Sequence, residues 1–392
     1  MKPFSIDIPQ SELDDLRRRL AHARWSQDLP GVGWARGVPL DYLKSMTEYW
    51  LNGYDWRAME RQLNGLPQFT TEIDGANVHF MHVRSPEPNA LPLIITHGWP
   101  GSVAEFLNVV GPLTNPVAHG GDAADAFHLV IPSIPGYGFS GPLREPGWDI
   151  ARIARAWAEL MNRLGYERYG TQGGDFGSPI SLGVGRVDPK HVVGVHTNML
   201  AVFPSGDPAE MANLSGEDMA RLGGLAKFDS DGSGYMKLLS TRPQTVSYAL
   251  NDSPIGQLAW IMERFKEWTA PAEVPEDVID RDLLLTNVMI YWLTGTAGSS
   301  GQLYYEITDL QRRQSADPTG EMLAGYREEP LNVPLGVAVF PNDCFVPVRR
   351  LADRDFTSIA HWSEFTRGGH FPAMEVPDLF VNDVRAFFRT VK

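Results

Sequence analysis

The sequence predicts an α/β fold in which a mostly parallel central sheet is covered by helices. Short apolar segments alternate with segments of helical spacing at 85–203, and the alternation resumes at 331–392, as expected for parallel strands joined by helices. Between these parts, at 204–330, helical spacing replaces the strand signals. We therefore predict one core, split by a helical lid insertion and preceded by an N-terminal cover segment at 1–84.

The cover segment is expected to contain two helices and a hairpin. Leucines recur at helical spacing from residue 13 to residue 20, and a second helix follows at 40–51 after a stretch rich in Pro, Gly and Trp. Asp74-Gly75 interrupts an alternating segment at 70–84, and this dipeptide is typical of a two-residue hairpin turn.

The core is expected to contain six strands. They are predicted at 91–96, 127–131, 167–171, 192–197, 333–340 and 359–366. Apolar residues at helical spacing mark a helix at 150–164, which Gly165 ends, and a final helix that begins at Pro377. Because strands alternate with helices, crossover connections would make neighbouring strands parallel.

Composition and charge exclude several classes of protein. The 392 residues carry 34 Lys and Arg against 48 Asp and Glu, and the net charge of −14 opposes binding to nucleic acid or to an anionic membrane. A single cysteine excludes an internal disulfide and a cysteine-based zinc site, that is, one held by several cysteines. No apolar run or leader indicates a membrane span or secretion. We expect a cytoplasmic protein with small-molecule partners, and a homodimer by default.

The sharpest functional signal is the sequence GGDFG at 173–177. It falls between a predicted strand and a helical segment, and glycines lie two residues before and after Asp175. This spacing is that of a nucleophile elbow, in which a tight turn lifts the nucleophile above the sheet at a helix N-terminus. The alternative is an aspartate that caps a helix beside a glycine-rich turn.

Two later residues have the positions of catalytic partners. Asp343 follows the predicted strand at 333–340, and His370 follows the strand at 359–366. Nucleophile, acid and histidine thus occur in the chain order of α/β hydrolases, so we predict a triad of Asp175, Asp343 and His370. For Asp343 the alternative is ordinary turn chemistry, since an Asn-Asp pair commonly follows a strand.

The segment HGWPG at 97–101 follows the first core strand, where backbone N–H groups of such hydrolases help to form an oxyanion hole. The expected donors are the amides of Trp99 and Phe176. An aspartate nucleophile favours attack at saturated carbon, because attack on an ester or amide would give a mixed anhydride. The resulting alkyl ester on Asp175 could be hydrolysed by water that His370 activates. An epoxide leaving oxygen would require phenolic O–H donors, and a halide would require indole or amide donors.

Several further motifs occur in order along the chain. They are HGWPG at 97–101, IPGYGFS at 134–140, GGDFGS at 173–178, GY at 234–235, STRP at 240–243, NDSP at 251–254 and RGGHF at 367–371. Together with Trp25 and Trp34 in the N-terminal segment, they resemble the microsomal-type epoxide hydrolases of the α/β-hydrolase superfamily, in the bacterial type without a membrane anchor. The resemblance covers nearly the whole chain.

This resemblance implies two ring-opening tyrosines in the lid, Tyr235 and Tyr304, with Tyr305 as the alternative to Tyr304. It also implies an enzyme that converts an epoxide and water to a vicinal diol without a cofactor or a metal. An aryl, styrene-oxide-like substrate in antibiotic biosynthesis is expected, with detoxification as another role. One departure is that the mammalian members have Glu in the acid position, where this chain has Asp343.

Two other functions stay open at this point. A haloalkane dehalogenase-like hydrolase would share the fold and the aspartate nucleophile, but such enzymes usually place a halide-binding Trp directly after the nucleophile, where this chain has Phe176. A catalytically silent ligand-binding protein could use the same cavity. The pair Asp175 and His370 favours an enzyme over this second alternative.

Overall fold

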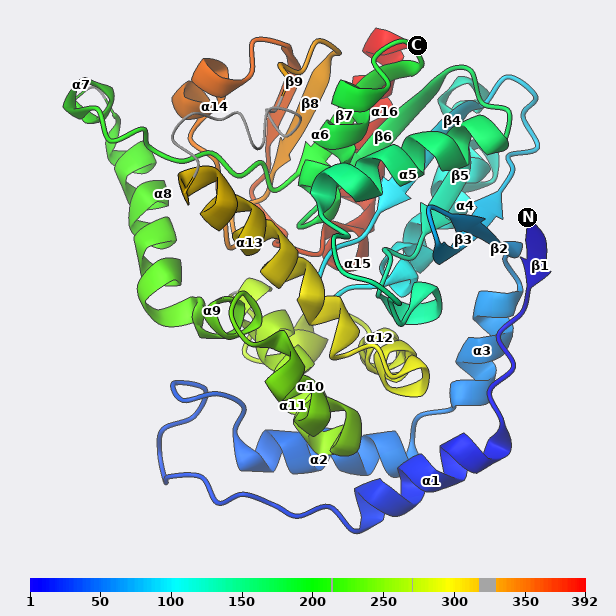
Figure 1. Cartoon of the computed structure of the whole chain (residues 1–392), viewed down its shortest axis with the longest axis vertical. Coiled ribbons are helices and arrows are strands. Elements are labelled where there is room, and N and C mark those ends of the chain that lie inside the picture. The colour runs from blue at the N-terminus through cyan, green and yellow to red at the C-terminus, as the bar shows by residue number, and fades with distance from the viewer. Residues whose placement is uncertain (213, 270, 317–328) are drawn as a thin grey trace.

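The computed structural model describes residues 1–212, 214–269, 271–316 and 329–392, and its central feature is one twisted sheet (Figure 1). The strands in these residues are β1 (Lys2–Phe4), β2 (Gln68–Ile73), β3 (Ala76–Val83), β4 (Leu91–Thr96), β5 (Phe127–Pro132), β6 (Tyr169–Gly173), β7 (Val192–Asn198), β8 (Leu335–Val339) and β9 (Ile359–Glu364). Their order across the sheet is β1-β2-β3-β5-β4-β6-β7-β8-β9. Pairing is parallel from β5 to β9 and antiparallel from β1 to β5, which confirms the mostly parallel sheet.

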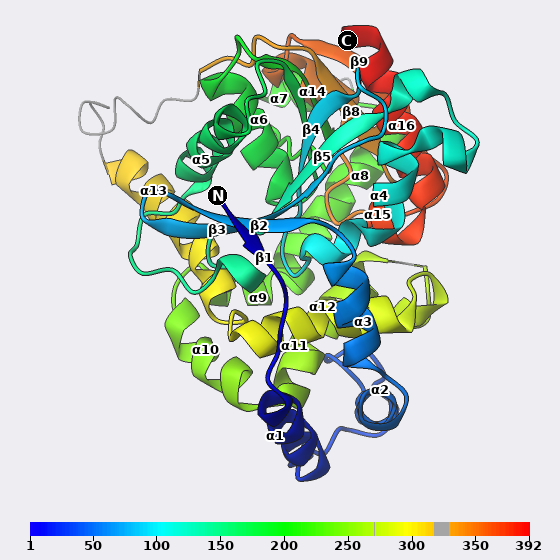
Figure 2. The ribbon, with the colours of Figure 1, turned by 90° about the vertical axis from the view of Figure 1, so that its right-hand side faces the viewer.

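Helices cover both faces of the sheet. On one face lie α5 (Ile150–Arg163) and α6 (Gly177–Val187), and on the other lie α4 (Leu107–Thr114) and α16 (Pro377–Val391) (Figure 2). The last helix approaches closely because two strands carry glycine beneath it. A Cβ atom on Gly336 would lie 2.6 Å from the ring of Phe387, and one on Gly194 would lie 2.8 Å from it.

The described part of 204–330, where the lid is predicted, contains helices and no strand. Its helices are α7 (Pro208–Met211), α8 (Gly216–Lys227), α9 (Gly234–Leu239), α10 (Pro243–Asp252), α11 (Pro254–Trp268), α12 (Arg281–Thr294) and α13 (Gln302–Ala316). No helix in the described ranges has the length and apolar character that a membrane span requires.

The N-terminal helices pack on the lid rather than on the sheet (Figure 1). They are α1 (Gln10–Ala21), α2 (Leu40–Asn52) and α3 (Trp56–Asn64). Tyr49 donates a hydrogen bond of 2.7 Å to the carboxylate of Asp282 at the start of α12, and Trp50 donates one of 3.1 Å to the sulfur of Met289. The cover segment therefore holds the lid in place.

Four features differ from the sequence prediction. β1 and α3 were not predicted, because the first has three residues and the second only nine. The predicted hairpin forms as β2 and β3 but belongs to the central sheet, since β3 pairs with β5. The strand predicted at 167–171 begins at Tyr169, where pairing with β7 starts.

Candidate active site

Asp175 lies in the sharp turn between β6 and α6. Its φ is +49°, a left-handed conformation that non-glycine residues seldom adopt and that marks a strained functional turn. The glycines around it are required by close backbone approach: a Cβ on Gly173 would overlap the carbonyl of Gly177, and a Cβ on Gly177 would overlap the carbonyl of Thr96. The sequence spacing thus reflects a real steric limit.

This limit predicts that Gly177→Ala lowers the free energy of unfolding by about 2–4 kcal/mol, because backbone atoms rather than a flexible side chain must move. A matched control is Gly223→Ala in α8, where an added Cβ meets no atom of the described residues within 4 Å. There we expect no loss or a gain of up to about 1 kcal/mol. Urea unfolding of both variants tests the prediction, and equal stabilities would contradict it.

The structure brings Asp175, Asp343 and His370 together. Nε2 of His370 lies 3.4 Å from Oδ2 of Asp175, and Nδ1 lies 2.8 Å from Oδ1 of Asp343. The side chains of His370 and Asp343 are 1% and 2% exposed, whereas that of Asp175 is 15% exposed. Burial by itself lowers the pKa of His370, but the charge of Asp343 and the hydrogen bonds to both carboxylates hold this pKa well above its ordinary value.

The two oxygens of Asp175 have different environments. Oδ1 accepts a hydrogen bond of 2.7 Å from the N–H of Trp99, while Oδ2 faces His370. Phe176 is the N-cap residue of α6, so its N–H has no partner within that helix and the helix dipole favours a negative charge beside it. The Trp99 N–H therefore lies on the Oδ1 side of the carboxylate.

The loop that carries Trp99 is held from two directions. His97 is buried, and its Nε2 accepts a bond of 3.2 Å from the Ile134 N–H while its Nδ1 donates to the carbonyl of Gly98. Burial lowers the pKa of His97 to about 4, so this histidine is neutral and structural. From the lid, Asn287 and Tyr291 of α12 donate to the carbonyls of Pro100 and Gly101 at 2.6 and 2.7 Å.

Tyr235 on α9 and Tyr304 on α13 form an aromatic wall beside this loop. The ring of Tyr235 stacks on Trp99 with centroids 5.0 Å apart, and the edge of Tyr304 meets Phe176 at 4.6 Å. The two tyrosine rings meet edge to face at 5.8 Å. Burial, and then nearby charges that include Asp175, raise the pKa of both phenols, so both stay protonated at neutral pH. Tyr305 points about 100° further around α13.

Other residues of the site were not predicted. The ring centroids of Trp268 and His370 lie 4.6 Å apart. The backbone carbonyl of Trp268 accepts a hydrogen bond of 3.0 Å from the backbone N–H of His370. The guanidinium of Arg264 lies 4.7 Å from the ring of Tyr235. Their only sequence signal was the helical spacing of α11, which does not distinguish a site residue from a core residue.

Two buried acids also lie near His370. Burial raises the pKa of Glu105 to about 8 and that of Glu375 to about 7, and in each case the charge of His370 acts in the opposite direction. Oε1 of Glu375 accepts the N–H of Phe371 at 2.8 Å, which supports the loop that carries the histidine. Neither acid has a motif that would have marked it in the sequence.

The strand order, the elbow and the histidine after the last strand define the α/β hydrolase fold. Residues 92–225 match the family model described as alpha/beta hydrolase fold. Residues 1–106 match a second model, described as Epoxide hydrolase N terminus. The two matches together agree with a hydrolase core that is preceded by a distinct N-terminal segment.

Full-length relatives identify the family. A provisionally named epoxide hydrolase of Stigmatella aurantiaca is 45% identical over 100% of this chain and 85% of its own length. Epoxide hydrolase 1 of Sus scrofa is 34% identical over 99% of this chain and 88% of its own. The solved structure of Aspergillus niger epoxide hydrolase has a TM-score of 0.85, with 32% identity, and covers 100% of this chain and 96% of that one. The chain belongs to the epoxide hydrolase family.

Proposed function

We propose that the protein hydrolyses epoxides through an alkyl ester on Asp175. The observation that carries this proposal is that the two carboxylate oxygens of Asp175 have different partners. Oδ1 accepts a hydrogen bond from the Trp99 N–H, whereas Oδ2 points to His370. A carboxylate held in this way is suited to attack with one oxygen while the other stays in the oxyanion hole. Water is the second substrate, and neither step needs a cofactor or a metal.

In the first step, Oδ2 of Asp175 attacks one carbon of the epoxide and the C–O bond at that carbon breaks. The oxygen stays attached to the neighbouring carbon and takes a proton from Tyr235 or Tyr304. The rings of both tyrosines contact Trp99, whose N–H binds Asp175, and both phenols retain their protons, as donors to an alkoxide must.

In the second step, Nε2 of His370 takes a proton from water, and the hydroxide attacks the carboxyl carbon of the ester. The negative charge that develops on Oδ1 is stabilised by the amides of Trp99 and Phe176. Collapse of this intermediate breaks the ester C–O bond, and the departing alkoxide takes the proton of the new carboxyl group, which releases the vicinal diol and leaves Asp175 as a carboxylate. The proton on His370 returns through solvent to the tyrosine that was deprotonated in the first step. Asp343 orients the ring and stabilises the imidazolium through the 2.8 Å hydrogen bond to Nδ1.

The raised pKa of His370 predicts a pH dependence with a definite sign. In the free enzyme, the bond to Asp175 and the charge of Asp343 keep the imidazolium stable despite burial. Esterification removes the charge of Asp175, so the pKa of His370 falls and the ring becomes a base. We expect the rate of ester hydrolysis to rise with pH through this lowered pKa and then to level off.

In Asp343→Asn, the pH range over which the rate of ester hydrolysis rises should shift to lower pH. The substitution removes the negative charge that raises the pKa of His370 most. It should also lower the plateau rate, since the ring is less well oriented. Single-turnover hydrolysis measured between pH 5 and about 9 tests both effects. A pH range that stays in place or moves to higher pH would contradict this role of Asp343.

The substrate that we propose is an aryl epoxide of the styrene oxide type. The support is the set of aromatic rings around Asp175, which can pack on an aryl group by edge-to-face contact. These rings are Trp99, Phe176, Tyr235, Trp268 and Tyr304. A place in antibiotic biosynthesis or detoxification, a cytoplasmic location and a homodimer remain predictions from the sequence.

The test is turnover of matched aryl epoxides, alkyl epoxides and haloalkanes, with diol and halide both measured. We expect diol from the epoxides, fastest from the aryl members, and no halide. Halide release with no diol would instead support a dehalogenase. Absence of turnover together with saturable binding would support the silent ligand-binding alternative.

A further inference from the structure

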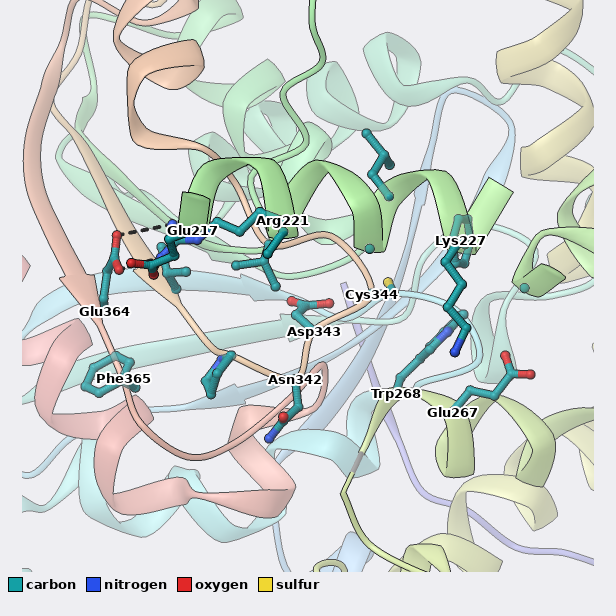
Figure 3. Close-up of a pocket in the computed structure, with 18 of the residues that line it drawn as sticks. Glu217, Arg221, Lys227, Glu267, Trp268, Asn342, Asp343, Cys344, Glu364 and Phe365 are labelled. Atoms are coloured by element: carbon teal, nitrogen blue, oxygen red, sulfur yellow. Dashed lines mark hydrogen bonds and ion pairs between the residues drawn. The ribbon is translucent and has the colours of Figure 1, made fainter. Parts of the chain in front are cut away.

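A pocket of about 580 Å³, which Asp343 lines, lies between α8 and the loop that follows β8 (Figure 3). Charged side chains of α8 form its rim, and Arg221 there pairs with Glu364 at 2.7 Å. Asp343 and Cys344 line the inner part beside Trp268. The mechanism above assigns no role to the pocket or to the thiol.

The thiol of Cys344 is placed against the catalytic histidine. Its Sγ lies 3.6 Å from Nδ1 of His370. The same nitrogen forms the hydrogen bond to Asp343. Burial raises the pKa of Cys344 to about 12, so the free thiol is protonated and is a poor nucleophile. Direct oxidation or alkylation of the free thiol is therefore disfavoured.

Asp343 adds a further possible ligand atom beside the thiol of Cys344 and the ring of His370. Its Oδ1 is engaged by His370, but Oδ2 is buried and has no hydrogen-bond partner among the residues that the structure describes. Such an orphaned carboxylate oxygen costs free energy unless a cation or a donor satisfies it. One ligand atom from each of Asp343, Cys344 and His370 lies within 4.8 Å of the others.

We propose that Asp343, Cys344 and His370 form an inhibitory site for a thiophilic divalent cation such as Zn²⁺ or Cd²⁺. Tetrahedral Zn²⁺ with bonds of about 2.0 Å to nitrogen and 2.3 Å to sulfur holds these two atoms about 3.5 Å apart. The separation of Sγ and Nδ1 is 3.6 Å. A carboxylate, a thiolate and an imidazole are a ligand set that selects such metals over Mg²⁺ or Ca²⁺, and a water molecule from the pocket would be the fourth ligand.

Binding at this site would stop hydrolysis by a defined route. The metal takes the place of the protons on Sγ and Nδ1, which are released to solvent, and the hydrogen bond from Nδ1 to Asp343 is lost. His370 can then neither be oriented nor be stabilised as an imidazolium. The inhibition rests on the proposed roles of Asp343 and His370, whereas metal binding itself does not.

Binding is tested by ultraviolet absorption during titration of the native protein with Cd²⁺. Because Cys344 is the only cysteine of the chain, any cadmium-thiolate charge-transfer band must come from this site. We expect one equivalent of Cd²⁺ to saturate the band in the native protein, and Cys344→Ser and Cys344→Ala to give none. A native protein that shows no band would overturn the proposal.

Inhibition is tested separately with Zn²⁺, and each variant is compared with its own metal-free rate of epoxide turnover. We expect both Cys344 variants to need at least about 10-fold more Zn²⁺ than the native enzyme for half inhibition, and Mg²⁺ to leave all three unaffected. Equal sensitivity of native enzyme and variants would overturn the inhibitory role. A cadmium band in a protein that turns over no epoxide would instead count against the proposed function alone.

Discussion

His370→Gln is expected to accumulate a covalent ester of the epoxide on Asp175 while turnover falls by about 10⁴-fold. Glutamine keeps a polar side chain near Asp175 and Asp343, but it cannot take a proton from water. The first step does not need His370 as a base, so alkylation continues and the ester persists. The expected loss corresponds to the upper end of what a positioned general base contributes.

Intact mass and peptide mapping after exposure to styrene oxide measure this result directly. The adduct should carry the full mass of the epoxide, since ring opening releases no leaving group, and it should map to Asp175. Asp175→Asn combined with His370→Gln is the matched control and should show no adduct. An adduct on another residue, or full turnover by His370→Gln, would refute the ester mechanism.

The elbow could be predicted from sequence because its chemistry is local. Close backbone contacts require glycine at 173 and 177, so the turn leaves a fixed spacing in the sequence. Asp343 and His370 followed from a topological rule, since side chains after parallel strands gather at one edge of the sheet. Both rules depend only on the order of elements along the chain.

The residues that were missed act through contacts between distant parts of the chain. Asn287 reaches Pro100 across 187 positions, and Trp268 meets His370 across the lid boundary. Their side chains follow the same helical spacing as ordinary core residues, so packing alone decides their role. The hairpin β2-β3 is similar: alternation predicts strands but does not say which sheet they join.

Replacing both lid tyrosines is expected to slow ring opening by more than about 10⁴-fold. Each phenol that donates to a developing oxyanion contributes about 10²-fold, and the rings of Tyr235 and Tyr304 lie 5.8 Å apart, so one can partly replace the other. Tyr235→Phe and Tyr304→Phe alone should therefore cost about 10²-fold each, and the double variant should cost more than the product of the two losses. Phenylalanine keeps the ring packing and removes only the O–H group.

The step affected is measured best in the His370→Gln background, where the rate of ester formation is observed without hydrolysis. There the two added tyrosine changes should nearly abolish the adduct. Tyr305→Phe is the matched control, because Tyr305 is the neighbour of Tyr304 on α13 but points about 100° away around the helix, and it should form the ester at the parental rate. Slowing by Tyr305→Phe but not by Tyr304→Phe would reassign the second donor to Tyr305. Unchanged ester formation in the Tyr235 and Tyr304 double variant would show that the epoxide oxygen takes its proton from another group.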